Sequence, residues 1–97
     1  MDERYELKGI SFVWDLNKAE TNLAKHGVSF GQAAEVFFDP FVRVTDAGSE
    51  DEARDAAIGM DERWNLLFVV HIVLEDDAIR IISARKATPS ERTFYEY

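Results

Sequence analysis

The fold is decided by residues 66–97, which read LLFVVHIVLEDDAIRIISARKATPSERTFYEY. Two runs rich in Val, Ile and Leu, residues 66–74 and 79–83, flank the polar segment Glu75-Asp76-Asp77-Ala78. This pattern is typical of two adjacent antiparallel strands. The stretch therefore predicts a buried hairpin on which the rest of the chain packs.

A C-terminal helix is predicted to follow this hairpin. Thr88 suits the N-cap position, and Pro89 suits the first helical position, where its missing N–H costs nothing. Glu91 completes a capping box with Thr88. We therefore expect helix from about Thr88 onward.

The register of the hairpin decides which polar side chains share a face. If the turn consists of Asp76 and Asp77, then Val73 faces Arg80 and His71 faces Ile82. This register places His71 and Arg80 on one face of the sheet. A slip of one residue would separate them.

The patterns upstream predict one strand and two helices. Residues 1–9 lack periodicity and are expected to form a loose lead-in, whereas residues 10–14 alternate like a half-buried strand. A first helix is expected at residues 18–26, with Asn17 and Glu20 at its start and Gly27 after its end. A second is expected at residues 30–38, which Ser29 and Gln32 begin and Asp39-Pro40 ends.

Two further strands, at residues 41–45 and more weakly at 54–60, complete the prediction. The fold class is α+β, an antiparallel β-sheet meander with two N-terminal helices and a C-terminal helix, all packed on one face. Ninety-seven residues suit a single domain spanning residues 1–97. The longest apolar run is too short for a bilayer, the N-terminus does not resemble a signal peptide, and Cys is absent, so we expect a cytoplasmic protein.

The charge of the chain restricts the classes of partner that it can bind. The net charge of -8 argues against a chain that coats itself with nucleic acid, because phosphate binding needs local cations. The acidic side chains gather between Asp46 and Glu62, where Arg54 is the sole cation. Such a segment is usually a solvated loop and otherwise a docking site for a basic partner.

Several classes of chemistry lack their signatures in this sequence. The two histidines lie far apart, and neither a metal-binding motif nor a Gly-rich phosphate loop is present, so we expect no metal and no cofactor. A triad with Ser83 and His71 would lack a nucleophile elbow. The two consecutive helices could be taken for a DNA-reading element, but the second presents Phe and Glu35 where base recognition needs Arg, Asn or Gln.

Metal-free cleavage of RNA stays open, because the 2′-hydroxyl is an internal nucleophile. The protein needs only to assist proton transfer and to stabilise the charge on phosphorus. Side chains with suitable groups are Lys25, His26, Arg54, Arg80, Arg85 and Tyr95.

Each of these side chains, and His71, also has a purely structural interpretation. Lys25 and His26 fall at a helix C-terminus, where cations favour the helix dipole. Arg54 can neutralise its acidic neighbours. Arg80 can form an ion pair with Glu75 or Asp77, and Arg85 can form one with Glu91. Tyr95 can be a packing residue, and His71 can be a hydrogen-bonded core residue.

Taken together, the motifs resemble one known family. The segments are FVWDLNKAETNLAKHGVSFGQAAEVFFDP, the stretch from Glu52-Ala53-Arg54 to Ile58-Gly59, and IRIISARKATPSERTFYEY. They are similar to the BrnT toxins of type II toxin-antitoxin systems, over residues 12–97. The resemblance implies a RelE-like fold and RNA cleavage without metal. It also implies neutralisation by a ribbon-helix-helix antitoxin, BrnA, and operator DNA contacts only through that antitoxin.

The resemblance also carries site residues over by motif. Lys25 and His26 match the KHG element, Arg54 matches the central arginine, and Arg80 and Arg85 match the RIISAR strand. Glu91, Arg92 and Tyr95 match the terminal helix. The alternative hypothesis is a non-catalytic or weakened BrnT-like module that binds an antitoxin and takes part in promoter autoregulation.

Overall fold

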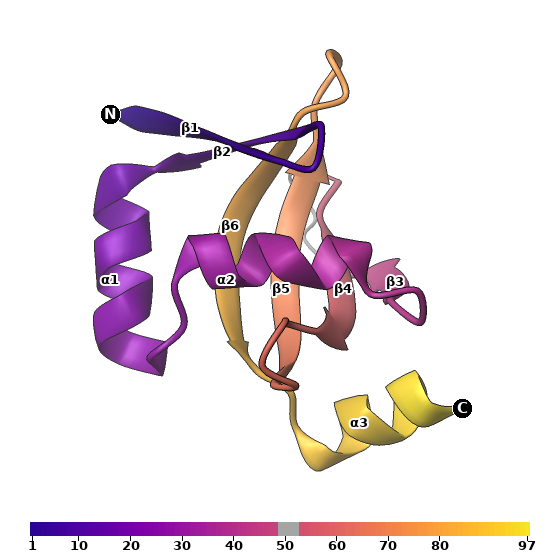
Figure 1. The fold of residues 1–97 in the computed structure, drawn as a ribbon. Coiled ribbons are helices and arrows are strands. Elements are labelled where there is room, and N and C mark those ends of the chain that lie inside the picture. The colour runs from indigo at the N-terminus through magenta and orange to yellow at the C-terminus, as the bar shows by residue number, and fades with distance from the viewer. Residues whose placement is uncertain (49–52) are drawn as a thin grey trace.

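The computed structural model describes residues 1–48 and 53–97, and a six-stranded sheet forms its centre (Figure 1). Its strands are β1 (Asp2–Leu7), β2 (Ile10–Asp15), β3 (Arg43–Asp46), β4 (Asp55–Met60), β5 (Leu66–Val73) and β6 (Ile79–Lys86), in the spatial order β1-β2-β6-β5-β4-β3. The predicted antiparallel meander of the last four strands is confirmed. Strand β2 joins β6 in parallel, so the sheet is mixed. Glu50, Asp51 and Glu52 of the acidic segment lie outside the described residues.

The first nine residues are not a loose lead-in, so that expectation was wrong. Residues 2–7 of this segment form β1, which pairs with β2 along its whole length. Lys8 and Gly9 both have positive φ, 50° and 85°, as a tight two-residue hairpin turn requires. Tyr5 and Leu7 pack against the core cluster. The charged residues Asp2, Glu3, Arg4 and Glu6 around them conceal this alternation in the sequence.

The central hairpin is present, but its predicted register is only half right. Val70 pairs with Ser83 as expected, whereas His71 pairs with Ile81 and Ile72 with Arg80. One extra residue, Ile82, is accommodated in β6 as a β-bulge between these pairs. The bulge puts His71 and Arg80 on opposite faces of the sheet, which corrects the prediction that they share one.

The helices begin and end at recognisable caps. Helix α1 (Leu16–His26) starts two residues earlier than predicted, because Asp15, not Asn17, accepts a hydrogen bond from the Lys18 N–H at 3.0 Å. Gly27 ends it with φ 70°.

The second helix is shorter than expected. Helix α2 (Phe30–Glu35) is capped by Ser29 and passes into the 3₁₀ turn η1 (Val36–Phe38). The Gln32 side chain does not close the predicted capping box and donates to Asp61 at 2.7 Å instead. Helix α3 (Pro89–Glu96) has the full capping box of Thr88 and Glu91.

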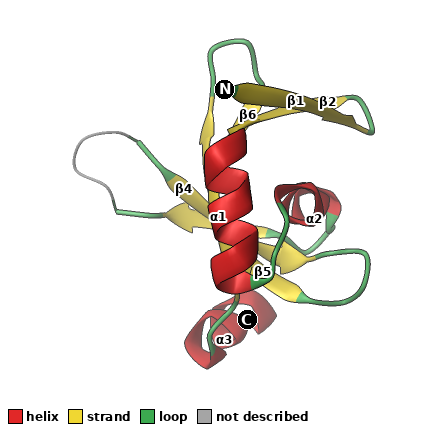
Figure 2. Cartoon of the chain, turned by 90° about the vertical axis from the view of Figure 1, so that its left-hand side faces the viewer, coloured by secondary structure: helices red, strands yellow, loops and turns green. Residues whose placement is uncertain are grey.

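The helices do not share one face of the sheet, contrary to the prediction. Helix α2 packs on what we call the inner face, where Phe30, Ala33 and Ala34 join the core with Val69 and other strand residues. On the outer face, the adjacent side chains of Ile58 and Phe68 lie against α3. Helix α1 stands at the sheet edge beside β6 (Figures 1 and 2).

Candidate functional site

Arg80 lies on the outer face of the sheet and forms an ion pair with an acidic side chain. Its guanidinium donates twice to the Asp2 carboxylate, with N–O distances of 2.7 and 3.3 Å. This hydrogen bonding lowers the pKa of Asp2 and raises that of Arg80. The expected partners Glu75 and Asp77 are not used, because β1 brings Asp2 close through the order β1-β2-β6.

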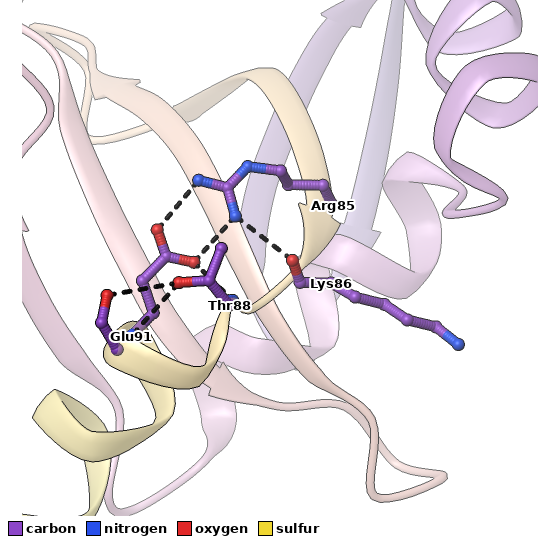
Figure 3. Close-up of polar contacts among 5 residues, drawn as sticks. Arg85, Lys86, Thr88 and Glu91 are labelled. Carbon is purple, nitrogen blue, oxygen red and sulfur yellow. Dashed lines mark hydrogen bonds and ion pairs between the residues drawn. The ribbon is translucent and has the colours of Figure 1, made fainter.

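Arg85 also lies on the outer face, and Glu91 at the start of α3 matches it. Both terminal guanidinium nitrogens donate to the Glu91 carboxylate, with N–O distances of 2.7 and 2.9 Å. Figure 3 shows how the two side chains face each other. The same group donates to the Lys86 carbonyl and lies 4.2 Å from the centroid of the Phe68 ring. Hydrogen bonds from Arg85 are the main cause of the lowered pKa of Glu91. The predicted structural pairing of Arg85 with Glu91 is confirmed.

The arginines of β6 therefore share a face without forming one positive pocket. Arg85 follows Arg80 by five positions, which corresponds to roughly 15 Å along a strand. Arg54 immediately precedes β4, and strand alternation places it on the same outer face as Ile58. The backbone carbonyl of Arg54 accepts from the Ala47 N–H at 2.9 Å.

His71 is a core residue, as its structural interpretation predicted. Its side chain is 3% exposed and packs edge-on against Phe37, with ring centroids 4.8 Å apart. The ring Nδ1–H donates to the Val69 carbonyl at 3.2 Å. Burial lowers the pKa of His71, so the ring is neutral and unavailable to a surface ligand.

The hydrogen-bond partner of Tyr95 is a carboxylate and not an arginine of β6. Its hydroxyl donates to Asp39 at 2.6 Å, which ties α3 to the segment after η1. Asp39 also accepts from the backbone N–H groups of Met60 and Phe41, at 2.8 and 2.9 Å. Burial and this hydrogen bond raise the pKa of Tyr95 to about 12, so the phenol keeps its proton at neutral pH.

Lys25 and His26 line a surface hollow between α1 and β6, with a volume of about 320 Å³. We call it the α1–β6 groove. Its lining residues are Asn17, Lys18, Thr21, Asn22, Lys25, His26, Ile82 and Ser83. Three of them are basic and none is a carboxylate. Four other hollows of this surface each contain at least one acidic side chain, for example Glu35, Asp39, Asp61 and Glu62 around Trp64.

The spacing of α1 explains how this groove acquires its charge. Lys18, Asn22 and Lys25 follow one another at intervals of four and three residues, and His26 falls four residues after Asn22. Residues at these intervals lie on one side of a helix. Lys18, Lys25 and His26 are solvent-exposed and make no ion pair with any other residue of the described ranges. Lys25 and His26 also fall in the last turn of α1, where the predicted interaction with the helix dipole remains available.

The sequence prediction named only part of this groove. Its site residues included Lys25 and His26 but not Lys18, Thr21 or Asn22, and Ser83 was considered only for a triad with His71. The polar stripe at helical spacing on α1 was a visible signal, whereas the approach of Ser83 depends on the three-dimensional packing of α1 against β6. Arg85 lies two residues beyond Ser83 on the same face of β6.

The groove offers groups suited to an anionic ligand. Lysines supply positive charge for a phosphate, histidine is the usual side chain for proton transfer near neutral pH, and hydroxyls can donate or accept. Within residues 1–48 and 53–97, no three His, Asp or Glu side chains are grouped as a metal site would need. No helix of the same ranges is long and apolar enough to cross a membrane.

A family model described as the ribonuclease toxin BrnT of type II toxin-antitoxin systems matches residues 14–91. The chain belongs to the BrnT family. A crystal structure of the Brucella abortus ribonuclease toxin BrnT is 27% identical in sequence and has a TM-score of 0.62. The match covers 77% of this chain and 92% of the Brucella chain. No curated protein matches this sequence. The family description places this BrnT-type chain among the ribonuclease toxins of type II toxin-antitoxin systems, which implies an antitoxin as partner.

Proposed function

We propose that this chain is an endoribonuclease toxin that binds and cleaves RNA at the α1–β6 groove without a metal ion. The observation that carries the proposal is the groove's charge: Lys18, Lys25 and His26 line it with no carboxylate, on a chain whose net charge is -8. An anionic backbone is attracted to such a locally basic surface and repelled by the acidic remainder. Family membership supplies the substrate class.

The chemistry can proceed with side chains alone. The 2′-oxygen attacks the adjacent phosphorus as its proton is removed, and the P–O5′ bond breaks as O5′ receives a proton. The products are a 2′,3′-cyclic phosphate and a 5′-hydroxyl. We assign one of these proton transfers to His26 and stabilisation of the phosphate charge to Lys25. General acid-base help of this kind contributes about 10²–10⁴-fold.

The ion-paired arginines are given a secondary part in this proposal. Arg85 is near the groove along β6, and the Glu91 carboxylate occupies the two donors that a phosphate would use. RNA that extends from the groove along the outer face must exchange its phosphate for that carboxylate. The same holds for Arg80 and Asp2. Arg54 lies on this face too, and Tyr95 is left with a structural part.

The proposal includes the partners that the resemblance implies. A BrnA-like ribbon-helix-helix antitoxin neutralises the toxin, and operator DNA is contacted only through that antitoxin. A RelE-like fold and action in the cytoplasm belong to the same proposal.

The ion pairs of Arg80 and Arg85 favour one alternative function. Arg80 and Arg85 are both held by carboxylates, so these two arginines of the outer face offer a phosphate less free positive charge than unpaired arginines would. A non-catalytic module that binds the antitoxin and takes part in promoter autoregulation would need no such charge.

Cleavage of a labelled single-stranded RNA by the purified chain, with and without EDTA, tests the proposal. We expect cleavage to persist in EDTA and to leave 5′-hydroxyl ends. His26→Gln should slow cleavage by about 10²-fold or more, whereas the matched surface variant Arg63→Gln, on another part of the molecule, should not. Intact RNA in every condition would reject the nuclease and leave the binding module.

Co-expression separates the two functions in cells. The nuclease should arrest growth when it is produced alone and be rescued by its antitoxin. A binding module should be harmless alone and should still form the complex.

A further inference from the structure

Asn22 occupies the junction between α1 and the part of β6 that has no partner strand on that side. Strand β2 pairs with β6 at Ile79 and Arg80, and the chain then leaves the sheet to form α1. Beyond Arg80, the backbone groups on this edge of β6 need partners other than a strand.

The Asn22 side chain supplies these partners. Its Oδ1 accepts from the Ala84 N–H at 3.1 Å, and its Nδ2 donates to the Ala84 carbonyl at 2.8 Å. A second Nδ2 hydrogen bond, at 2.9 Å, reaches the Val28 carbonyl in the α1–α2 connection. One amide thus imitates the missing strand and joins three segments. Asn22 is only 6% exposed and is the single buried residue of α1.

These contacts set the geometry of the α1–β6 groove. Asn22 lies three residues before Lys25 and four before His26, so the three side chains stem from adjacent turns on one side of α1. Ala84 directly follows Ser83, which forms the opposite wall. The planar amide therefore fixes both the distance and the rotation of the basic wall relative to β6.

We propose that Asn22 is a positioning residue for the proposed RNA cleavage, acting by holding His26 and Lys25 against the β6 wall of the groove. The inference rests on the proposed function. A displacement of a catalytic group by about 1 Å can cost on the order of 10²-fold in rate, so loss of Asn22 should lower kcat far more than it raises KM.

The test is a double-mutant cycle with Asn22→Ala and His26→Gln, measured on a short RNA at a temperature where every variant is folded by circular dichroism. We expect Asn22→Ala to lower kcat by about 10²-fold in the original chain, and by less than about threefold once His26 is replaced. The control for stability alone is Val36→Ala, which removes fully buried volume on the inner face, far from the groove lining. It should lower the melting temperature and leave kcat unchanged.

If Asn22→Ala does not fold, Asn22→Ser provides the same comparison with a smaller loss of hydrogen bonding. An Asn22 variant that loses no more activity than Val36→Ala, or whose effect multiplies independently with that of His26→Gln, would overturn the inference while the nuclease stands. Absence of cleavage by the unmodified chain would reject the nuclease, and the positioning role with it.

Discussion

Arg85 and Glu91 form a doubly hydrogen-bonded ion pair that holds the first turn of α3 against the outer face of the sheet. Glu91 has a second task in the same turn, because it accepts from the Thr88 N–H at 2.9 Å. One carboxylate thus caps a helix and neutralises an arginine of the family's motif. Replacing it separates the structural part of Arg85 from any part in RNA binding.

Glu91→Gln should reduce the free energy of unfolding by about 1 kcal/mol, since a charge-assisted pair at a partly exposed site is lost. It should also tighten binding of an uncleavable 2′-O-methyl RNA. A plot of the logarithm of the association constant against the logarithm of the salt concentration should become steeper by about 0.7, the value for one additional phosphate contact to a single-stranded RNA. Glu96→Gln, with the same charge change in α3, is the control. Equal slopes in both variants would show that Arg85 is purely structural.

Asp2→Asn should release Arg80 in the same way. Asp2 is on the exposed N-terminal strand and contributes both acceptors of the Arg80 guanidinium. The binding isotherm with 2′-O-methyl RNA should shift to lower protein concentration. Glu3→Gln provides the matched control, because Glu3 points to the other face of β1. If both variants shift the isotherm equally, only net charge matters and Arg80 has no direct part.

Tyr95→Phe should weaken the fold without impairing RNA cleavage. Loss of the hydrogen bond to Asp39 should cost about 1 kcal/mol, while kcat should change less than about threefold, on the order of 0.6 kcal/mol. Because the folded-state pKa of Tyr95 is raised to about 12, its stabilising effect is present below pH 10 and is lost as pH rises toward 12. Denaturant unfolding at pH 8 and 11 measures this, with the exposed Tyr97→Phe as control. A large fall in kcat would restore Tyr95 to the catalytic set.

His71 should make stability depend on pH in the mildly acidic range. Its pKa is lowered in the folded protein, so the unfolded chain takes up a proton first as the pH falls below about 6.5. The free energy of unfolding should then decrease by at most about 1.4 kcal/mol per pH unit. Denaturant unfolding from pH 7.5 to 5.5 should show this decrease in the original chain and in His26→Gln, but not in His71→Leu. If the free energy of unfolding of His71→Leu decreased by the same amount, the pH dependence would come from another titratable group.

The sequence predicted what depends on local chemistry. The hairpin, the caps at Ser29 and Thr88 and the stop at Gly27 all follow from residues close together in the chain. The partner of Arg80 could not be predicted in this way, because Asp2 is 78 residues away and approaches only through the strand order. The bulge at Ile82 was equally hidden, since no residue type in that strand demands it, and it moved Arg80 to the face opposite His71.

For the site, sequence reasoning identified the chemically active groups but not their grouping. Lys25 and His26 were named, and they line the same groove. Arg80, Arg85 and Tyr95 were named with them, but acidic partners hold all three elsewhere. Asn22 was not among the predicted site residues, because its hydrogen bonds to Ala84 in β6 depend on the packing of α1 against that strand.

The contact between Asn22 and Ala84 spans 62 residues of chain. A growing polypeptide that has not yet reached β6 therefore has the α1 wall of the groove but lacks the opposite wall, to which Ser83 belongs. The groove can therefore form only after nearly the whole chain, through β6, has been synthesised.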